Sequence, residues 1–135
     1  MNAGLCSGLL VALLSVASWP LSAADTQLLR HVQGLSRDYY YLNIESPAQP
    51  FQVQDIVGGE HENQYFILGF AGDQFSIAID SLEGDAGYSL GGEGYQAQQQ
   101  AAGDHVLVEL PHTWIRIQVS AHPYAEYRLR VKKYE

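Results

Sequence analysis

The sequence predicts an all-β protein, folded as a single antiparallel β-sandwich of about eight strands. Two observations carry this prediction. Apolar and polar residues alternate with period two over 115–119 and 127–131, which is typical of strands with one buried and one solvated face. Turn-forming glycine, proline and aspartate residues separate the apolar segments, and several short strands in a chain of this length favour a sandwich or a small barrel.

The expected elements follow one another along the chain. The spacing of Leu28, Val32 and Leu35 indicates a short amphipathic helix over 25–36, although Gly34 disfavours it. From there on we expect strands. Aromatic or β-branched residues, alternation and intervening turns predict them at residues 39–44, 51–56, 65–70, 75–79, 88–90, 106–110, 114–119 and 127–131.

The first 24 residues have the features of a cleavable signal peptide. An apolar run over 9–17 is followed by Pro20 and by the small residues Ser22-Ala23-Ala24, and the first charged side chain is Asp25. The run is shorter than the ~20 apolar residues that a membrane-spanning helix needs. No Lys or Arg precedes it, so an uncleaved anchor and a buried helix stay as alternatives. We expect a periplasmic or secreted protein with no membrane span after cleavage.

The remaining chain has the size of one domain. We expect residues 25–50 to form an N-terminal extension, a short helix plus a strand, and residues 51–135 to form the β-sandwich domain. The only cysteine, Cys6, lies in the predicted signal peptide. The mature protein is therefore expected to have no disulfide, no thiol nucleophile and no cysteine-based metal site.

The chain is acidic, and its charges are unevenly placed. The formal net charge is −8, and twelve carboxylates but no Lys or Arg lie between Arg37 and Arg116. Such a surface repels nucleic acid and anionic lipid, and it attracts basic partners. The alternative is that the acidity only keeps the protein soluble.

Catalytic patterns are missing from the sequence. The five histidines are scattered, and none accompanies a Gly-x-Ser-x-Gly motif. Glu60-His61-Glu62 lacks the second histidine of a helical zinc motif. We therefore expect a protein that is not an enzyme.

Three carboxylates cluster at Asp80, Glu83 and Asp85. Calcium takes several oxygen ligands from a flexible loop, so these side chains are the candidate ligands for Ca²⁺. The loop lacks the density of acidic residues of a dedicated calcium site, and the alternative is that all three are solvated. No other cofactor is expected.

Residues 88–95 contain three glycines in four positions. We expect them to form a mobile loop that presents Tyr88, Gly92, Glu93 and Tyr95 to a protein partner, because glycine permits unusual backbone conformations and tyrosine is a frequent interface anchor. The alternative is a plain hairpin connection whose tyrosines pack back onto the sandwich.

A second exposed connection is expected at His122-Pro123-Tyr124-Ala125, where His122 and Tyr124 are further candidates for partner binding. It joins the last two predicted strands. If these pair as a hairpin with Ile117 opposite Leu129, then Arg116 faces Arg130, and this like-charge pair needs acidic partners.

These segments resemble a known family. Residues 64–68, 71–79, 84–90, 110–119 and 127–131 resemble the bacterial pre-peptidase C-terminal (PPC-like) β-sandwich, in the order of that family and over roughly residues 52–132. A single-domain chain with a signal peptide looks more like the small periplasmic inhibitors of g-type and i-type lysozymes, which use the same jelly-roll-like sandwich. Their Ser-Gly-x-x-Tyr motif is matched at Gly92 and Tyr95, whereas Gly91 stands in the place of Ser.

The resemblance implies that loops at one end of the sandwich block the glycan cleft of a basic cell-wall hydrolase. The expected function is that of an exported inhibitor of a peptidoglycan-cleaving enzyme, either a lysozyme inhibitor or an immunity protein against a hydrolase from a rival cell. A carbohydrate- or calcium-binding accessory module and a structural subunit of the envelope are the alternatives.

Overall fold

The computed structural model describes residues 27–135, and the predicted signal peptide lies outside this range. The described chain is built from eight strands and confirms the all-β prediction. The strands are β1 (Leu28–Gln33), β2 (Arg37–Leu42), β3 (Phe51–Gly58), β4 (Glu62–Phe70), β5 (Gln74–Gly91), β6 (Tyr95–Gln100), β7 (Gly103–Val108) and β8 (His112–Lys133). Within residues 27–135, no helix has the length and apolar character needed to cross a membrane.

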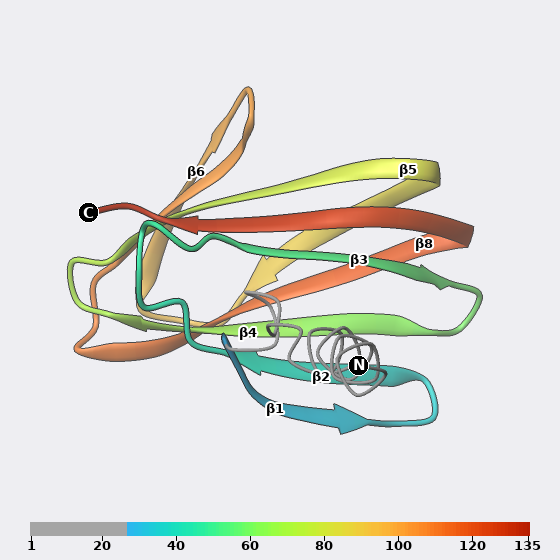
Figure 1. Cartoon of the computed structure of the whole chain (residues 1–135), viewed down its shortest axis with the longest axis horizontal. Helices are drawn as coiled ribbons and strands as arrows, with labels where there is room; N and C mark the ends of the chain where they lie inside the picture. The colour runs from blue at the N-terminus through green and yellow to red at the C-terminus, as the bar shows by residue number, and fades with distance from the viewer. Residues whose placement is uncertain (1–26) are drawn as a thin grey trace, which may run out of the picture.

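Two strands, β5 and β8, are much longer than the rest, with 18 and 22 residues. They pair with each other antiparallel over almost their whole length, from Phe75 opposite Lys133 to Gly91 opposite Arg116. The register shifts after Ser81 and again after Gly84. Such bulges bend a strand, and here the paired ribbon turns back on itself (Figure 1).

The bend divides one hydrogen-bonded sheet into two facing layers. The lower layer of Figure 1 contains the first half of β8 and the second half of β5, together with β4, β2 and β1. The other halves join β3 and the β6–β7 hairpin in the upper layer. All neighbouring strands are antiparallel except β2 and β4, which are parallel, so the prediction of a purely antiparallel sandwich is wrong at this pair.

The core lies between the layers. Alternate side chains of each strand point inward, which explains the period-two pattern of the sequence. Contacts cross the gap directly: the Phe51 and Tyr65 rings are 6.1 Å apart between centroids, and the Tyr65 and Tyr127 hydroxyl oxygens are 2.5 Å apart. The fully buried apolar residues come from both layers and include Ile67, Phe75, Ile77, Val106, Ile115, Ile117, Val119, Leu129 and Val131.

Three local predictions need correction. Residues 28–33 form the edge strand β1 rather than a helix, because they pair with β2, where the His31 and Tyr40 rings stack 4.3 Å apart. Both β1 and β2 thus belong to the main sheet, although they lie in the range that we set apart as an extension. The two predicted strands at 114–119 and 127–131 are halves of β8.

The expected hairpin between those two segments does not form, because each half of β8 lies in a different layer. Arg116 is opposite Phe66 and Gly91, whereas Arg130 is opposite Gln52 and Ala78. The two arginines therefore do not face each other, and the like-charge pair that we expected is absent.

Candidate partner-binding surface at the loop end

The glycine-rich loop is shorter than predicted. Residues 88–91 belong to β5 and Tyr95 begins β6, so only residues 92–94 form the connection. It lies at the end of the sandwich opposite the bend, together with the 109–111 connection and the 71–73 turn (Figure 1). We call this the loop end; the other end, where β5 and β8 turn back, is the bend end.

Two glycines shape this loop. Gly92 and Gly94 have φ angles of 98° and 83°, in the region that favours glycine. Neighbouring atoms also leave no room for a side chain at either position. A Cβ atom at Gly92 would lie 2.6 Å from the Trp114 carbonyl oxygen, and one at Gly94 would lie 2.3 Å from Leu110 Cδ1. The loop therefore packs closely on the 110–114 segment.

Hydrogen bonds hold the loop on both sides. The Tyr95 hydroxyl donates to the Gly91 carbonyl oxygen at 2.8 Å, and the Thr113 hydroxyl donates to the Glu93 carbonyl oxygen at 2.5 Å. The Gly94 carbonyl oxygen accepts bonds from the backbone N–H groups of Glu109 and Leu110, at 2.8 and 3.1 Å. This loop is thus fixed in one shape by its neighbours.

Two of the three tyrosines that we predicted as partner contacts, Tyr88 and Tyr95, have internal hydrogen bonds. Tyr95 is half-buried, and burial raises the pKa of its hydroxyl while Arg116 lowers it. The Tyr88 hydroxyl lies 2.5 Å from Asp104 Oδ2 and 3.2 Å from the Ile77 carbonyl oxygen, and burial raises its pKa. Both rings brace the scaffold around the loop, which leaves the Glu93 side chain as the exposed group at its tip.

Three large apolar side chains are exposed at this end of the sandwich, and the sequence reasoning missed them. Phe70, Leu110 and Trp114 expose 47%, 46% and 37% of their surface. Leu110 lies against Gly94, and a backbone bond from Ala71 to Pro111 joins the segments that carry Phe70 and Leu110. The Trp114 ring instead packs edge-on against Tyr41 of β2, with 5.6 Å between the ring centroids. A large apolar residue next to a turn signal is the pattern that could have revealed Phe70 and Leu110.

Arg116 occupies the space beside Gly91. A Cβ atom at Gly91 would lie 2.3 Å from Arg116 Nη2 and 2.6 Å from its Nε. The guanidinium thus fills the place that a side chain at position 91 would take, next to the carbonyl that anchors Tyr95. A serine at this position would displace the flexible end of the Arg116 side chain.

The other predicted contact residues, His122 and Tyr124, are exposed but lie at the bend end. They cannot form one continuous surface with Glu93, because the whole length of the sandwich separates the two ends. Tyr124, Ile56 and Glu126 line an open groove of about 440 Å³ there.

A buried polar network lies near that bend end. Asn63 Nδ2 donates to the Tyr127 hydroxyl at 2.8 Å and to Asp55 Oδ2 at 3.1 Å, and Tyr127 is bonded to Tyr65. Burial raises the pKa of Tyr127 to about 12, and it also raises the pKa of Tyr65. These bonds connect β3, β4 and β8 across the two layers.

The three carboxylates predicted as calcium ligands are not brought together. Asp80 Oδ2 forms an ion pair with Arg130 Nη2 at 3.0 Å. In the part of the chain that the structure describes, no three Asp, Glu, His or Cys side chains converge into a possible metal site. Glu83 and Asp85 are exposed on the bulged part of β5.

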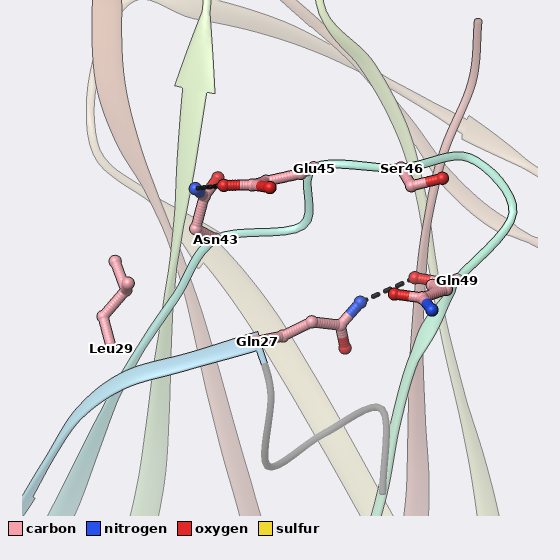
Figure 2. Close-up of a pocket in the computed structure, with 6 residues that line it drawn as sticks. All are labelled: Gln27, Leu29, Asn43, Glu45, Ser46 and Gln49. Atoms are coloured by element: carbon pink, nitrogen blue, oxygen red, sulfur yellow. Dashed lines mark hydrogen bonds between the residues drawn. The ribbon is translucent and has the colours of Figure 1, made fainter. Parts of the chain in front are cut away.

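A further small cavity, of about 240 Å³, lies between the start of β1 and the 43–50 connection (Figure 2). Its polar side chains bond to the chain around it: Gln27 Nε2 donates to the Gln49 carbonyl oxygen at 2.6 Å, and Asn43 Nδ2 donates to Glu45 Oε1 at 3.0 Å. The bond to Gln49, together with one from the Asn43 backbone N–H to the Gln27 carbonyl oxygen, holds the 43–50 connection beside Gln27, the residue before β1.

Comparisons with known proteins identify a similar fold but no relative by sequence. No family model matches the chain, and no curated protein matches it. The structure of PliG from Aeromonas hydrophila, a periplasmic inhibitor of g-type lysozyme, aligns with a TM-score of 0.54 and 13% identity, over 73% of this chain and 100% of that one. PliG from Salmonella Typhimurium aligns with a TM-score of 0.52 and 13% identity, over 70% and 97%.

A PliG mutant from Escherichia coli aligns with a TM-score of 0.52 and 12% identity, over 73% of this chain and 99% of that one. At this identity the likeness concerns the fold. It confirms the resemblance to the lysozyme inhibitors at that level, whereas the resemblance to the PPC-like sandwich stays a prediction.

Proposed function

We propose that this chain is an exported, non-enzymatic protein that inhibits a peptidoglycan-cleaving enzyme by inserting its loop end into the glycan cleft. The observation that carries the proposal is the fold: nearly the whole length of three periplasmic inhibitors of g-type lysozyme superimposes on this chain. Fold alone does not establish function, so the proposal also rests on the chemistry of the loop end.

That loop end suits insertion into a cleft. Its tip presents a carboxylate, Glu93, and the exposed Leu110 side chain lies against the same loop at Gly94. Because hydrogen bonds already fix the loop, little conformational entropy is lost on binding, and pre-organisation of this kind favours affinity. Among residues 27–135, Glu93 forms no ion pair, so its charge is available to a cationic group of the enzyme.

The charge of the whole chain supports the same partner. A net charge of −8 speeds the approach of a basic hydrolase by electrostatic steering. A lysozyme and a toxic hydrolase delivered by a rival cell both meet this description. We infer a periplasmic location, because the target acts on the cell wall.

The proposal is tested by measuring inhibition of g-type, i-type and c-type lysozymes, and of cell-wall amidases, with a turbidity assay on suspended cells. Glu93→Lys should weaken inhibition about thirtyfold or more, which corresponds to about 2 kcal/mol, the usual threshold of an interface hot spot. The variant should keep its melting temperature, because the Glu93 side chain is exposed.

Tyr124→Ala is the matched control, since it removes an exposed side chain at the opposite end. It should inhibit as well as the unmodified protein. Loss of inhibition in Tyr124→Ala but not in Glu93→Lys would move the binding surface to the bend end. Absence of inhibition of every hydrolase by the unmodified protein would refute the proposal.

A further inference from the structure

The outer face of the upper layer carries a basic stripe on an otherwise acidic protein. Along β8, Arg128, Arg130 and Lys132 alternate with the buried Leu129 and Val131, so all three point outward. Each of these side chains has neighbours on the adjacent strands β3 and β5. Gln54 and Asp80 flank Arg128, Gln52 and Ala78 flank Arg130, and Ser76 lies beside Lys132.

Small residues on β5 leave a trough next to this stripe. Ser76 and Ala78 are short, whereas the β8 side chains beside them are long. On the other side, the turn of the β6–β7 hairpin lies close to β5, since a Cβ atom at Gly103 would be 2.1 Å from the Ile77 carbonyl oxygen. Two open hollows of about 400 and 360 Å³ result, and Ala78, Ala102 and Arg130 line both of them.

The lining of the trough combines positive charge with amide groups. Arg130 and Lys132 supply the charge, and Gln52, Gln99 and Gln100 supply groups that both donate and accept hydrogen bonds. The Arg130 ion pair with Asp80 is solvated, with 51% and 47% of the two side chains exposed, so it holds the guanidinium only weakly.

We propose that this trough binds a glycan that carries carboxylate groups. The guanidinium of Arg130 and the ammonium of Lys132 would pair with the carboxylates, and the amides would bond to sugar hydroxyls. Beneath the basic side chains the backbone of β8 is paired on both sides, with β3 and β5. A peptide therefore cannot add as a strand there, which favours a ligand recognised through side chains.

The probe is oligogalacturonate, a glycan with one carboxylate on each ring, measured by isothermal titration calorimetry. Binding should weaken as the salt concentration rises, because exposed charges are screened. The double variant Arg130→Gln with Lys132→Gln should lose at least tenfold in affinity. The matched control, Arg30→Gln with Arg37→Gln, removes the same charge from β1 and β2 in the other layer and should keep it.

Two further ligands decide what the trough recognises. Methyl-esterified oligogalacturonate keeps the sugar chain without the charge, and poly-glutamate keeps the charge without the sugar; both should bind at least tenfold more weakly. The proposal is overturned if oligogalacturonate does not bind, if the Arg130–Lys132 variant binds it unchanged, or if either comparison ligand binds equally well. The same variant should inhibit hydrolases normally, so failure of this proposal is separable from failure of the inhibitor proposal.

Discussion

The loop end and the bend end of the sandwich are both closed by close backbone contacts, but they expose different side chains. At the bend end, backbone packs on backbone: a Cβ atom at Gly58 would lie 2.2 Å from the Pro123 carbonyl oxygen, and one at Gly84 would lie 2.3 Å from that of Tyr124. At the loop end, the backbone N–H groups of Glu109 and Leu110 donate to the Gly94 carbonyl oxygen, and the Tyr95 and Thr113 hydroxyls add side-chain bonds to the 92–94 connection.

The backbone positions at the bend end must be kept for the layers to meet, whereas the exposed side chains at the loop end can change. Backbone contacts allow no added side chain, so the bend end determines how the two layers meet. The exposed groups at the loop end, such as Glu93 and Leu110, can change without moving the strands. Recognition is commonly placed on connections that a rigid scaffold supports, and the 92–94 connection is one of this kind.

The largest effect is expected from Gly58→Ala. The new Cβ would collide with the backbone of Pro123 and Tyr124, and the φ angle of 144° is unfavourable for alanine. Overpacking and backbone strain together should lower the free energy of unfolding by about 3 kcal/mol or more, measured by urea denaturation.

Gly72→Ala is the control for this change. Its φ angle of 90° is also unfavourable, but nothing lies within 4 Å of the added atom. It should cost about 1–2 kcal/mol, the strain alone. Equal losses in the two variants would show that backbone packing at the bend end contributes little.

Alkaline pH should destabilise the bend end next. Burial raises the pKa of Tyr127 to about 12; burial, with Asp55 and Asp38, raises that of Tyr40 to about 12. Unfolded tyrosine ionises near pH ~10, so above this pH the unfolded chain loses protons that the folded protein retains. Stability should be constant up to about pH 10 and then fall toward pH 12, on the order of 1 kcal/mol per pH unit for a buried phenol such as Tyr127.

Urea denaturation at a series of pH values measures this loss, and absorbance at 295 nm reports phenolate. At pH 11 the folded protein should show less phenolate than the same protein in concentrated urea. Stability that stays constant up to pH 12 would contradict the assignment of the buried network.

The smallest effect is expected from Tyr95→Phe at the loop end. It removes the bond to the Gly91 carbonyl oxygen and keeps the ring, so it should cost about 1 kcal/mol of stability. Because the loop is then less firmly held, affinity for the hydrolase should fall by a few-fold, measured in the inhibition assay. Tyr124→Phe makes the same chemical change at an exposed position and should alter neither quantity.

Much of the strand pattern was predictable, because alternation and turn residues are local signals. The segments 51–56 and 65–70 lie within β3 and β4, whereas 106–110 overlaps β7 only at residues 106–108. Continuity was not predictable in the same way. The break between 119 and 127 contains a proline and polar residues, which indicate a turn, yet β8 runs through it because β3 and β5 pair with its second half.

In the candidate site, too, the residue types were predictable from the sequence, whereas their contacts were not. Gly92, Glu93 and Tyr95 were predicted as partner contacts from composition, since glycine-rich connections and tyrosines are visible in the sequence. The roles of the two tyrosines were not visible, because a hydroxyl finds its acceptor only after distant strands have met: Tyr88 bonds to Asp104 across 16 positions. The contact of Arg116 with Gly91 likewise joins two strands that are far apart in the chain.

By itself, the sequence determined that this protein is all-β, acidic and without a catalytic motif, since these properties follow from residue type and short-range period. Only the tertiary structure decided that two long strands bend into both layers, that Glu93 and Tyr124 lie at opposite ends, and that Arg130 and Lys132 are exposed on one face beside the half-buried Arg128. The physical reason is that bends and pairings depend on contacts between residues far apart in sequence, and no local pattern encodes which strands will meet.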